Sequence, residues 1–351
     1  MSLPELDDLL AGLRVVSIPM RVAFRGVEHR EAALVQGPVG WGEFSPFLEY
    51  APQEAARWLA SAIEAAWEGW PAPLRDRVPV NATVPAVSAE DVAGVLACYD
   101  GCRTVKVKVA ERGQSLADDV CRVAAVRDVM GTDARIRVDA NGGWDVDQAV
   151  TALGALAAYG LEYAEQPCAS VEQLRELRIA LAHRGIDVLI AADESIRKAE
   201  DPLRVAREQA ADIIVVKVAP LGGVRRALDI AQACGLPTVV SSALDTSVGI
   251  AAGAALAAAL PALPYACGLA TVELLAGDVA RPSVVPLGGW IGVGPAAVEP
   301  SLLDALEASD ERTQWWRERM TVCHAALARQ ARQLDPTRSP RQVGGQVGGR
   351  G

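Results

Sequence analysis

The chain has 351 residues, of which 51% are hydrophobic and 22% charged, so it can bury a large core and form about two domains. Its formal net charge of −10 at pH 7 argues against nucleic acid and anionic membranes as partners, because an acidic chain repels phosphate groups. An anionic substrate would have to be held by a local cation. The acidic N-terminal residues lack the basic start of a signal peptide, so we expect a cytoplasmic protein.

Cysteine usage and the longest apolar stretch support the same expectation. Seven cysteines, none of them in a CxxC pair, predict free thiols in a reducing cytoplasm rather than a disulfide framework. The longest apolar stretch, 248–263, is built largely of Ala and Gly and is interrupted by Pro261. It is shorter than the roughly 20 apolar residues that span a bilayer. It therefore predicts a closely packed helix, and no membrane association is expected.

Residues 1–79 predict a small α+β domain. Strands are expected over 13–20 and 32–35, followed by a turn near 37–40 and a third strand end that begins at Trp41. Pro52 then begins a predicted helix that runs to about Trp67, with apolar residues at helical spacing. The pattern indicates a short antiparallel sheet covered by one helix.

From residue 80 the pattern changes to a repeat of about 25 residues. Apolar runs begin near residues 80, 104, 135, 161, 188, 212, 237 and 265, and Ala-rich helical segments lie between them. Continuous apolar strands that alternate with helices indicate a parallel sheet buried on both faces. Eight such strands favour a closed (β/α)8-type barrel over an open doubly wound sheet. No GxGxxG follows the first strand, which weakens a dinucleotide-binding alternative.

The chain after the eighth run is expected to return to the first domain. Residues 271–297 are rich in Gly and Pro, and 302–334 are predicted to be helical. The tail, 336–351, has no apolar periodicity and is predicted to be disordered. The expected parts are therefore a first domain over 1–79, a barrel over 80–270, a return over 271–335 and the tail.

Five ionisable residues stand at the ends of successive predicted strands: Lys108, Asp139, Glu165, Asp193 and Lys217. Because the carboxyl ends of the strands in a parallel barrel open on one face, we expect these side chains to meet in one pocket. Three neighbouring carboxylates would repel one another unless some are protonated or a cation lies among them. An all-oxygen set without His or Cys suits Mg²⁺ or Mn²⁺ rather than zinc.

The two lysines predict proton transfer. A lysine is a base only when it is neutral, so one of them needs a pKa below the ordinary ~10.4, which burial and a nearby divalent cation both favour. Lys106 has the same facing as Lys108, and its charge would lower the pKa of Lys108 further. A metal ion with a lysine base predicts removal of a proton next to a carboxylate. The alternatives are a Schiff-base aldolase that uses Lys217 and a barrel kept as a binding module.

The motifs at these strand ends resemble, in order, those of the muconate-lactonising subgroup of the enolase superfamily. They are Lys106-Val-Lys108, Asp139-Ala-Asn141, Glu165-Gln-Pro167, Asp193-Glu-Ser195 and the run from Lys217 to Gly223. The resemblance covers nearly the whole chain. It implies an α/β fold, namely a modified TIM barrel of the (β/α)7β type with an N-terminal α+β capping domain that C-terminal segments complete.

The same resemblance implies a role for each site residue. Asp139, Glu165 and Asp193 would hold Mg²⁺, with Mn²⁺ as a substitute. Lys108 and Lys217 would be the acid/base pair, with Lys217 either transferring protons or acting only as a cation. The supporting groups next to them would be Lys106, Asn141 and Glu194.

Missing motifs narrow the resemblance. None of the three histidines stands at a predicted strand end, unlike in the mandelate-racemase subgroup, and the Asp-x-Asp of dipeptide epimerases is absent near the eighth strand. The chain is then most similar to the o-succinylbenzoate synthase family of menaquinone biosynthesis. That similarity implies a lyase that dehydrates 2-succinyl-6-hydroxy-2,4-cyclohexadiene-1-carboxylate through a metal-stabilised enediolate. The alternative is an N-acyl (N-succinyl) amino acid racemase on the same scaffold. The candidate contacts for this small carboxylate substrate are Arg25, Asn81, Ser242, Gly268 and Leu269.

Overall fold

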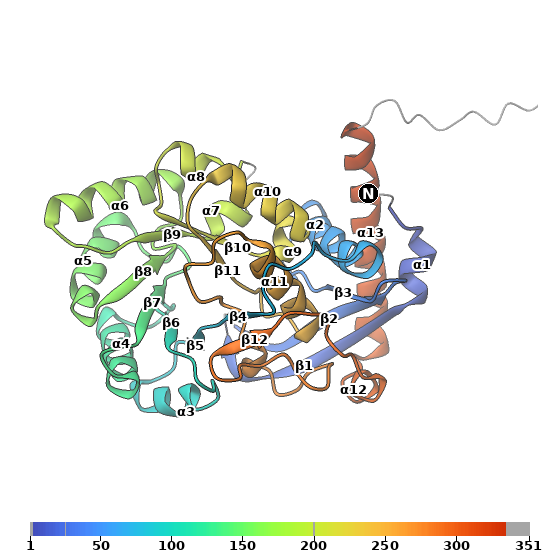
Figure 1. Cartoon of the computed structure of the whole chain (residues 1–351), viewed down its shortest axis with the longest axis horizontal. Coiled ribbons are helices and arrows are strands. Elements are labelled where there is room, and N and C mark those ends of the chain that lie inside the picture. Colours follow the sequence, from blue (N-terminus) through green and yellow to red (C-terminus); the bar gives the residue numbers. More distant parts are fainter. Residues whose placement is uncertain (1–2, 25, 199–200, 335–351) are drawn as a thin grey trace, which may run out of the picture.

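The computed structural model describes residues 3–24, 26–198 and 201–334. A curled sheet surrounded by helices lies beside a smaller sheet that is also covered by helix (Figure 1). The predicted disordered tail, 336–351, lies outside the described residues, and so does Arg25.

The N-terminal part is an antiparallel sheet covered by a helix, as the sequence predicts. After α1 (Leu6–Ala11), β1 (Leu13–Phe24) pairs with β2 (Val27–Gln36), which pairs with β3 (Trp41–Phe44). Strands β1 and β2 are longer than expected because their pairing continues, with a shift of register, as far as Phe24 and Val27. Helix α2 (Pro52–Ile63) begins at a proline, whose fixed φ suits the first helical turn, and it continues as a π-helical turn over Glu64–Glu68.

The C-terminal segments return to this first part of the chain. The predicted helix over 302–334 is two helices, α12 (Pro300–Ala305) and α13 (Asp310–Leu334). The break has a backbone cause, because the Ala308 N–H donates to the Val15 carbonyl and the Leu306 carbonyl accepts from the Ser17 N–H. Residues 306–308 therefore pair with β1 instead of continuing the helix. Trp316 of α13 packs edge-on against Phe44, with ring centroids 5.7 Å apart.

Seven parallel strands form the curled sheet, in the order β11-β10-β9-β8-β7-β6-β5. Each strand is followed by helix, which confirms the predicted α/β barrel. The strands are β5 (Ala82–Val84), β6 (Thr104–Lys108), β7 (Arg135–Asp139), β8 (Leu161–Glu165), β9 (Ile190–Ala192), β10 (Ile213–Val216) and β11 (Thr238–Val240). The helices are α3 (Val92–Leu96), α4 (Leu116–Met130), α5 (Val146–Leu156), α6 (Val171–Arg184), α7 (Glu194–Arg197), α8 (Arg204–Arg207), α9 (Val218–Leu221), α10 (Val224–Cys234) and α11 (Ser247–Ala259).

The eighth predicted strand is reduced to a short extended segment that joins the two edges of the sheet. Cys267 bridges to Val80 before β5, and Gly268 bridges to Ser241 after β11. The Asn81 N–H donates to the Cys267 carbonyl at 2.9 Å, and the Gly268 N–H donates to the Val240 carbonyl at 2.8 Å. These bonds close the ring. A 3₁₀ turn over Thr271–Leu274 comes directly after this segment, and β12 (Trp290–Gly292) then pairs with β4 (Arg77–Pro79).

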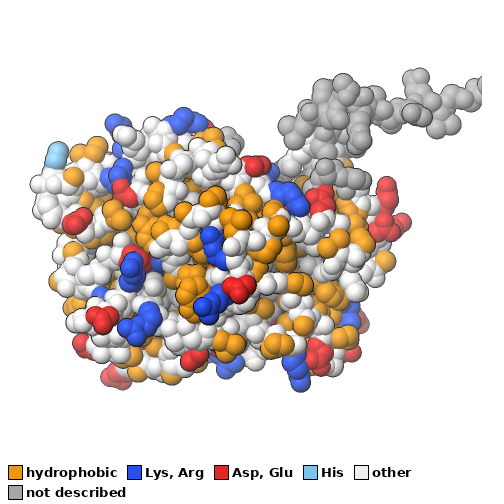
Figure 2. Space-filling model, viewed as in Figure 1, with side chains coloured by type: hydrophobic (Ala, Val, Ile, Leu, Met, Phe, Trp, Pro, Cys, Tyr) orange, Lys and Arg blue, Asp and Glu red, His pale blue; other side chains and the backbone are white. Residues whose placement is uncertain are grey.

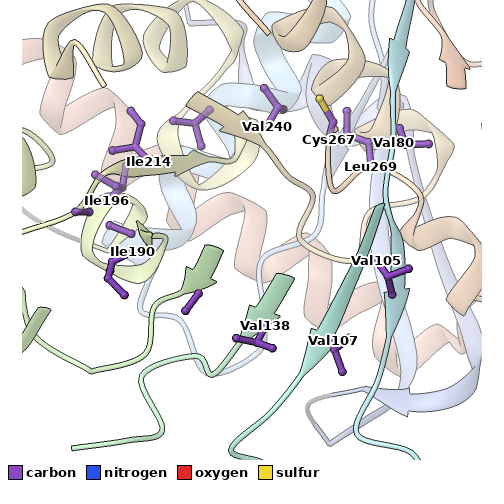
Figure 3. Close-up of a cluster of buried hydrophobic side chains, with 14 of the residues drawn as sticks. Val80, Val105, Val107, Val138, Ile190, Ile196, Ile214, Val240, Cys267 and Leu269 are labelled. Carbon is purple, nitrogen blue, oxygen red and sulfur yellow. The ribbon is translucent and has the colours of Figure 1, made fainter. Parts of the chain in front are cut away.

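Side chains alternate between the helices and the barrel interior along each strand. Val105, Val107 and Val138 belong to the large apolar cluster between sheet and helices, which also contains Val123 and Val126 of α4 (Figure 3). The alternate positions on β6, Lys106 and Lys108, therefore face the interior. A separate interior layer is apolar, formed by Tyr163, Ala191, Ile213, Val215 and Val239. Two residues further along these strands stand the polar groups of the candidate site.

Arg137 stands below that site, inside the barrel, and is fully buried. Its Nε donates to Glu162 at 2.5 Å, and one Nη donates to the Ala266 carbonyl at 2.7 Å and to Asn81 Oδ1 at 3.2 Å. Its guanidinium lies 4.7 Å from the centroid of the Tyr163 ring. A buried cation with these partners fixes the floor of the barrel interior.

Arg137→Met is expected to lower the free energy of unfolding by about 3–5 kcal/mol, because it leaves the partly buried Glu162 without its buried partner. Arg135 is the matched control, since it also bonds to Glu162 but its side chain is 65% exposed. Arg135→Met should cost no more than about 1 kcal/mol. Urea unfolding of both variants measures the difference. Equal costs for the two substitutions would contradict this account of Arg137.

The charges on the visible surface are mixed (Figure 2), and the cysteines are free thiols. On the face seen in Figure 2, Lys and Arg side chains lie scattered among Asp and Glu and form no continuous basic patch among the described residues. In the described part of the chain, no helix is both long and apolar enough to cross a bilayer. All seven cysteines are free, and five of them are buried.

Candidate active site

A pocket opens at the carboxyl ends of the barrel strands. Its cavity volume is about 40 Å³, which is smaller than the roughly 300–1,000 Å³ typical of small-molecule sites. The residues that line it are Phe47, Thr83, Lys106, Lys108, Asp139, Asn141, Arg197, Lys217, Ser241, Ser242, Ala243, Leu244, Gly268 and Thr271. Its walls thus come mostly from the barrel, with Phe47 contributed by the N-terminal part.

Three lysines line this pocket. Lys106 and Lys108 are two residues apart on β6 and point into the pocket together, as their period-two spacing predicts. Lys217 follows β10, which three strands separate from β6 in the sheet. All three are 7% exposed. The sequence has only one other lysine, Lys198, among 34 basic residues, so lysine is concentrated in this pocket.

The three predicted carboxylates stand in register on neighbouring strands. Lys108 of β6 pairs with Asp139 of β7, and Asp139 pairs with Glu165 of β8. Glu165 in turn pairs with Ala191 of β9, and Asp193 is two residues further along with the same facing. The three carboxylates are at most 1% exposed. The structure therefore brings these residues together as the strand rhythm predicts.

Each carboxylate is paired with a cation. Lys106 Nζ lies 3.1 Å from Glu165 and 3.4 Å from Asp139. Lys108 Nζ lies 2.5 Å from Asp139 Oδ2, and Lys217 Nζ lies 2.7 Å from Asp193 Oδ2. Charges this deeply buried would be costly unless paired. The alternation of ammonium and carboxylate groups is what allows the five to share one pocket.

Asn141 and Glu194 connect these groups. Lys108 Nζ donates to Asn141 Oδ1 at 2.6 Å, and Asn141 Nδ2 donates to Glu194 Oε1 at 3.2 Å. Asn141 has φ +47, a left-handed conformation that asparagine tolerates better than most residues. Its side chain therefore links the end of β7 to α7 and holds the Lys108 amine in place.

Arg197 is a pocket residue that the strand pattern did not predict. Its Nε donates to Asp193 Oδ1 at 3.0 Å, its Nη2 contacts Glu194 at 2.5 Å, and its Nη1 donates to the Tyr50 hydroxyl at 2.9 Å. The side chain thus joins the barrel to the loop before α2. In the sequence, Arg197 could have been found by its position, because it lies four residues after Asp193, the spacing at which side chains on one helical face meet.

Gln166 has a supporting role that the Glu165-Gln-Pro167 motif alone did not reveal. It is fully buried with φ +40. Its Oε1 accepts from the Asp193 N–H at 2.9 Å and from the Ser195 N–H at 3.2 Å, while its Nε2 donates to Ser195 Oγ at 2.8 Å. One side chain at the end of β8 therefore fixes the turn that presents Asp193.

The predicted substrate contacts divide into two groups. Ser242 and Gly268 line the pocket, and Ser242 Oγ donates to the Gly268 carbonyl at 2.9 Å. Asn81 and Leu269 are not among the lining residues. Asn81 bonds to Arg137 below the site, and Leu269 packs in the apolar cluster against Gly253 of α11. Other lining residues that were not predicted as contacts are Phe47, Thr83, Ser241, Ala243, Leu244 and Thr271.

Electrostatics in the pocket favour proton transfer by Lys108. Burial lowers the pKa of Lys108, and the neighbouring Lys106 charge lowers it further, against the opposing effect of Asp139. Burial and the charge of Asp139 raise the pKa of Glu165 to about 7. The attraction of Glu165 and Asp139 outweighs burial and raises the pKa of Lys106 above its usual value. Of the two lysines on β6, Lys108 therefore releases its proton more readily than an ordinary lysine, and Lys106 less readily.

The donor set fits a hard divalent cation, although here lysine and arginine side chains neutralise the carboxylates. Among the residues that the structure describes, no three acidic, His or Cys side chains stand close enough to enclose a metal ion. The carboxylates do lie within electrostatic range, because Asp139 and Asp193 both raise the pKa of Glu165. Asp139 lines the pocket, whereas Glu165 and Asp193 are not among its lining residues. Together the three buried carboxylates match the oxygen ligands that Mg²⁺ prefers.

Family models match both parts of the chain. The enolase C-terminal domain-like family matches residues 89–297, and the enolase N-terminal domain-like family matches residues 15–66. The chain belongs to the enolase superfamily. Divalent-metal dependence is general in this superfamily. The resemblance first drawn from the five strand-end motifs is confirmed.

Curated relatives place the chain within the superfamily. An o-succinylbenzoate synthase from Mycolicibacterium smegmatis is 61% identical over 325 residues, covering 92% of this chain and 98% of the relative. The o-succinylbenzoate synthase from Mycobacterium tuberculosis is 57% identical over 93% of this chain and 97% of its own. The o-succinylbenzoate synthase from Thermobifida fusca is 55% identical over 92% of this chain and 99% of its own. The chain is therefore a member of the o-succinylbenzoate synthase family.

Solved structures agree on the fold. A muconate lactonizing enzyme from Pseudomonas fluorescens superimposes with a TM-score of 0.72 over 84% of this chain and 98% of its own, at 22% identity. An N-succinyl Arg/Lys racemase from Bacillus cereus superimposes with a TM-score of 0.68 over 85% of this chain and 97% of its own, at 19% identity. Identities this low support the shared barrel and capping arrangement and nothing further.

Proposed function

We propose that the protein is an o-succinylbenzoate synthase, a lyase that dehydrates 2-succinyl-6-hydroxy-2,4-cyclohexadiene-1-carboxylate to 2-succinylbenzoate and water. The observation that carries the proposal is the 61% identity to a curated synthase over 92% of the chain. The pocket supports it, because Lys108 and Lys217 both line it and the three carboxylates stand beside them. Free cysteines and a small carboxylate substrate support a cytoplasmic location.

The metal ion that we propose is Mg²⁺, with Mn²⁺ as a substitute. Asp139, Glu165 and Asp193 would hold it, because they supply buried oxygen donors on three neighbouring strands. When bound, the ion neutralises the negative charge that develops on the substrate carboxylate as the adjacent proton leaves.

Lys108 is proposed as the base and then the acid. In its neutral form it takes the proton from the ring carbon that bears the carboxylate. The electron pair released forms the ring double bond as the hydroxyl group leaves the neighbouring carbon. The Lys108 ammonium returns the same proton to the departing hydroxide, so that water is formed and the lysine is neutral again. Asn141 Oδ1, 2.6 Å from Nζ, orients the amine for both transfers.

Lys217 is proposed to act as a cation on the opposite side of the pocket. Its ammonium group, held 2.7 Å from Asp193, lies where it can stabilise the negative charge of the substrate after proton removal. Two lysines that reach one pocket from β6 and β10 also suit racemisation. An N-succinyl amino acid racemase activity is therefore the second candidate, tested by loss of α-deuterium from a chiral N-succinyl amino acid.

The deciding experiment is turnover of the cyclohexadiene substrate by the purified protein, followed in the ultraviolet. We expect rapid aromatisation with Mg²⁺, and loss of activity with EDTA that Mg²⁺ or Mn²⁺ restores. An untouched substrate in the presence of Mg²⁺ would exclude the synthase activity. Turnover undiminished by EDTA, together with borohydride trapping of Lys217, would favour Schiff-base chemistry instead.

A further inference from the structure

One wall of the pocket is a segment of unusual backbone shape. Residues 241–244 follow β11 and all four line the pocket. Leu244 has φ +61, a left-handed conformation that is unfavourable for a residue with a Cβ. Its side chain is nearly fully buried. The segment therefore needs contacts from outside to keep this shape.

Arg30 of β2 supplies those contacts from the N-terminal sheet. Its side chain is buried, and its Nε donates to the Leu244 carbonyl at 2.8 Å. Its Nη2 donates to the Ala243 carbonyl at 3.2 Å and to the Ser45 carbonyl at 2.5 Å. The guanidinium also lies 4.8 Å from the centroid of the Phe47 ring. One side chain thereby joins two lining residues, Phe47 and Leu244, that are almost 200 residues apart in sequence.

Glu43 of β3 holds the other end of the same segment. Its carboxylate accepts from the Thr246 N–H at 3.1 Å, from Thr246 Oγ at 2.7 Å and from the Gly249 N–H at 2.9 Å, at the start of α11. A Cβ at position 249 would lie 3.0 Å from Glu43 Oε2 and 2.6 Å from the Asp245 Cβ. Only glycine permits this approach, so β3 and α11 lie side by side (Figure 1).

Arg30 also balances the charge of two buried acids. Burial and the charge of Asp245 raise the pKa of Glu43 to about 7, whereas Arg30 and the Ser45 hydroxyl lower it. Ser45 Oγ donates to Glu43 Oε1 at 2.7 Å and accepts from Arg30 Nη2 at 3.0 Å. An uncharged residue at position 30 would remove the cation that lowers the pKa of both acids. A test must therefore keep the positive charge and change only the geometry.

We propose that Arg30 is a positioning residue for substrate binding, which fixes Leu244 and Phe47 and so sets the shape of the pocket wall away from the metal ligands. The inference deepens the proposed function and rests on it. Lys108 and Lys217 are carried by β6 and β10 of the barrel, whereas Arg30 acts on the segment after β11. Loss of the Arg30 contacts should therefore weaken substrate binding and spare the chemical step.

Arg30→Lys is the variant that tests this role. Lysine keeps the charge but lacks the planar fork, so it cannot donate to the Leu244 and Ser45 carbonyls together. We expect KM for the cyclohexadiene substrate to rise about tenfold, the effect of losing one hydrogen bond of a charged donor, with kcat changed by less than about threefold. Arg21→Lys is the matched control, because Arg21 of β1 also donates its Nε to a carbonyl, that of Leu275, at 2.8 Å, but not in the pocket wall. Its KM should equal that of the wild type.

Ser45→Ala is a milder second variant, which removes only the hydroxyl between Arg30 and Glu43, and it should raise KM about threefold. It decides the question if Arg30→Lys does not fold. Unchanged KM in the folded variants would overturn the positioning role, and so would a fall in kcat at constant KM. The wild type is assayed in parallel. Its failure to turn over the substrate would overturn the proposed function itself, whereas wild-type turnover with unchanged variants overturns the role of Arg30 alone.

Discussion

Lys108→Ala is expected to lower kcat by about 10⁴-fold, the upper end of what a positioned acid/base group contributes. The loss should be this large because the same amine is proposed to take the proton and to return it. The protein should still fold, since Asp139 keeps Lys106 as a partner at 3.4 Å. Single-turnover measurements with the cyclohexadiene substrate, alongside a thermal melt, separate loss of chemistry from loss of structure.

Lys198→Ala is the matched control for that experiment. Lys198 is the one lysine of the sequence outside the pocket, and it is exposed, with its Nζ 5.1 Å from the centroid of the Tyr50 ring. An exposed cation–π contact contributes about 0.5–1 kcal/mol, so this variant should keep its kcat. Near-wild-type turnover by Lys108→Ala would exclude Lys108 as the base and leave Lys217 as the candidate for proton removal.

The barrel could be predicted from the sequence because its strands are buried on both faces. Such strands have to be continuous apolar runs, and a helix has to separate each from the next, so the period is visible without any tertiary information. The site residues could be predicted for the same reason, since a charged residue at the end of a buried strand can face only the barrel interior or the helices. On β6, Lys106 and Lys108 alternate with Val105 and Val107, which shows this alternation directly.

Contacts between segments distant in sequence could not be predicted in this way. Arg30 meets the Leu244 carbonyl 214 residues further along the chain, and nothing in the local pattern of β2 marks it. Arg197 lies on α7, a helix of only four residues, which is too short to give a hydrophobic period. The helical segment is also interrupted at 306–308, because the backbone there bonds to β1. Helical propensity does not reveal such a pairing.

The lysine partners of the carboxylates were another feature that the motif pattern left open. The sequence places Asp139, Glu165 and Asp193 on one face, but whether each faces a cation of the chain or a bound ion depends on side-chain reach. Lys106 spans from β6 to Glu165 on β8, passing Asp139 of the strand between. Lys106 thus bridges two of the three carboxylates, a contact that strand spacing alone does not reveal.

Glu165→Gln is expected to weaken Mn²⁺ binding by at least about 100-fold, the upper end of the effect of altering residues that merely support metal ligands. The amide offers one neutral oxygen in place of a carboxylate, which hard cations bind far less well. Turnover should fall in parallel, because the charge on the substrate carboxylate would no longer be neutralised. Calorimetric titration with Mn²⁺ in the absence of substrate gives the affinity without reference to activity.

Glu172→Gln is the control for this substitution, since Glu172 is a glutamate of α6 whose side chain is 62% exposed and which pairs with Arg204. It should bind Mn²⁺ as the wild type does. In Glu165→Gln the Lys106 ammonium loses its nearer partner and retains only Asp139, so the ammonium is expected to compete more strongly for Asp139 and to add to the loss of metal affinity. Wild-type affinity for Mn²⁺ in Glu165→Gln would therefore exclude Glu165 as a ligand and place the metal ion, if one is required, away from β8.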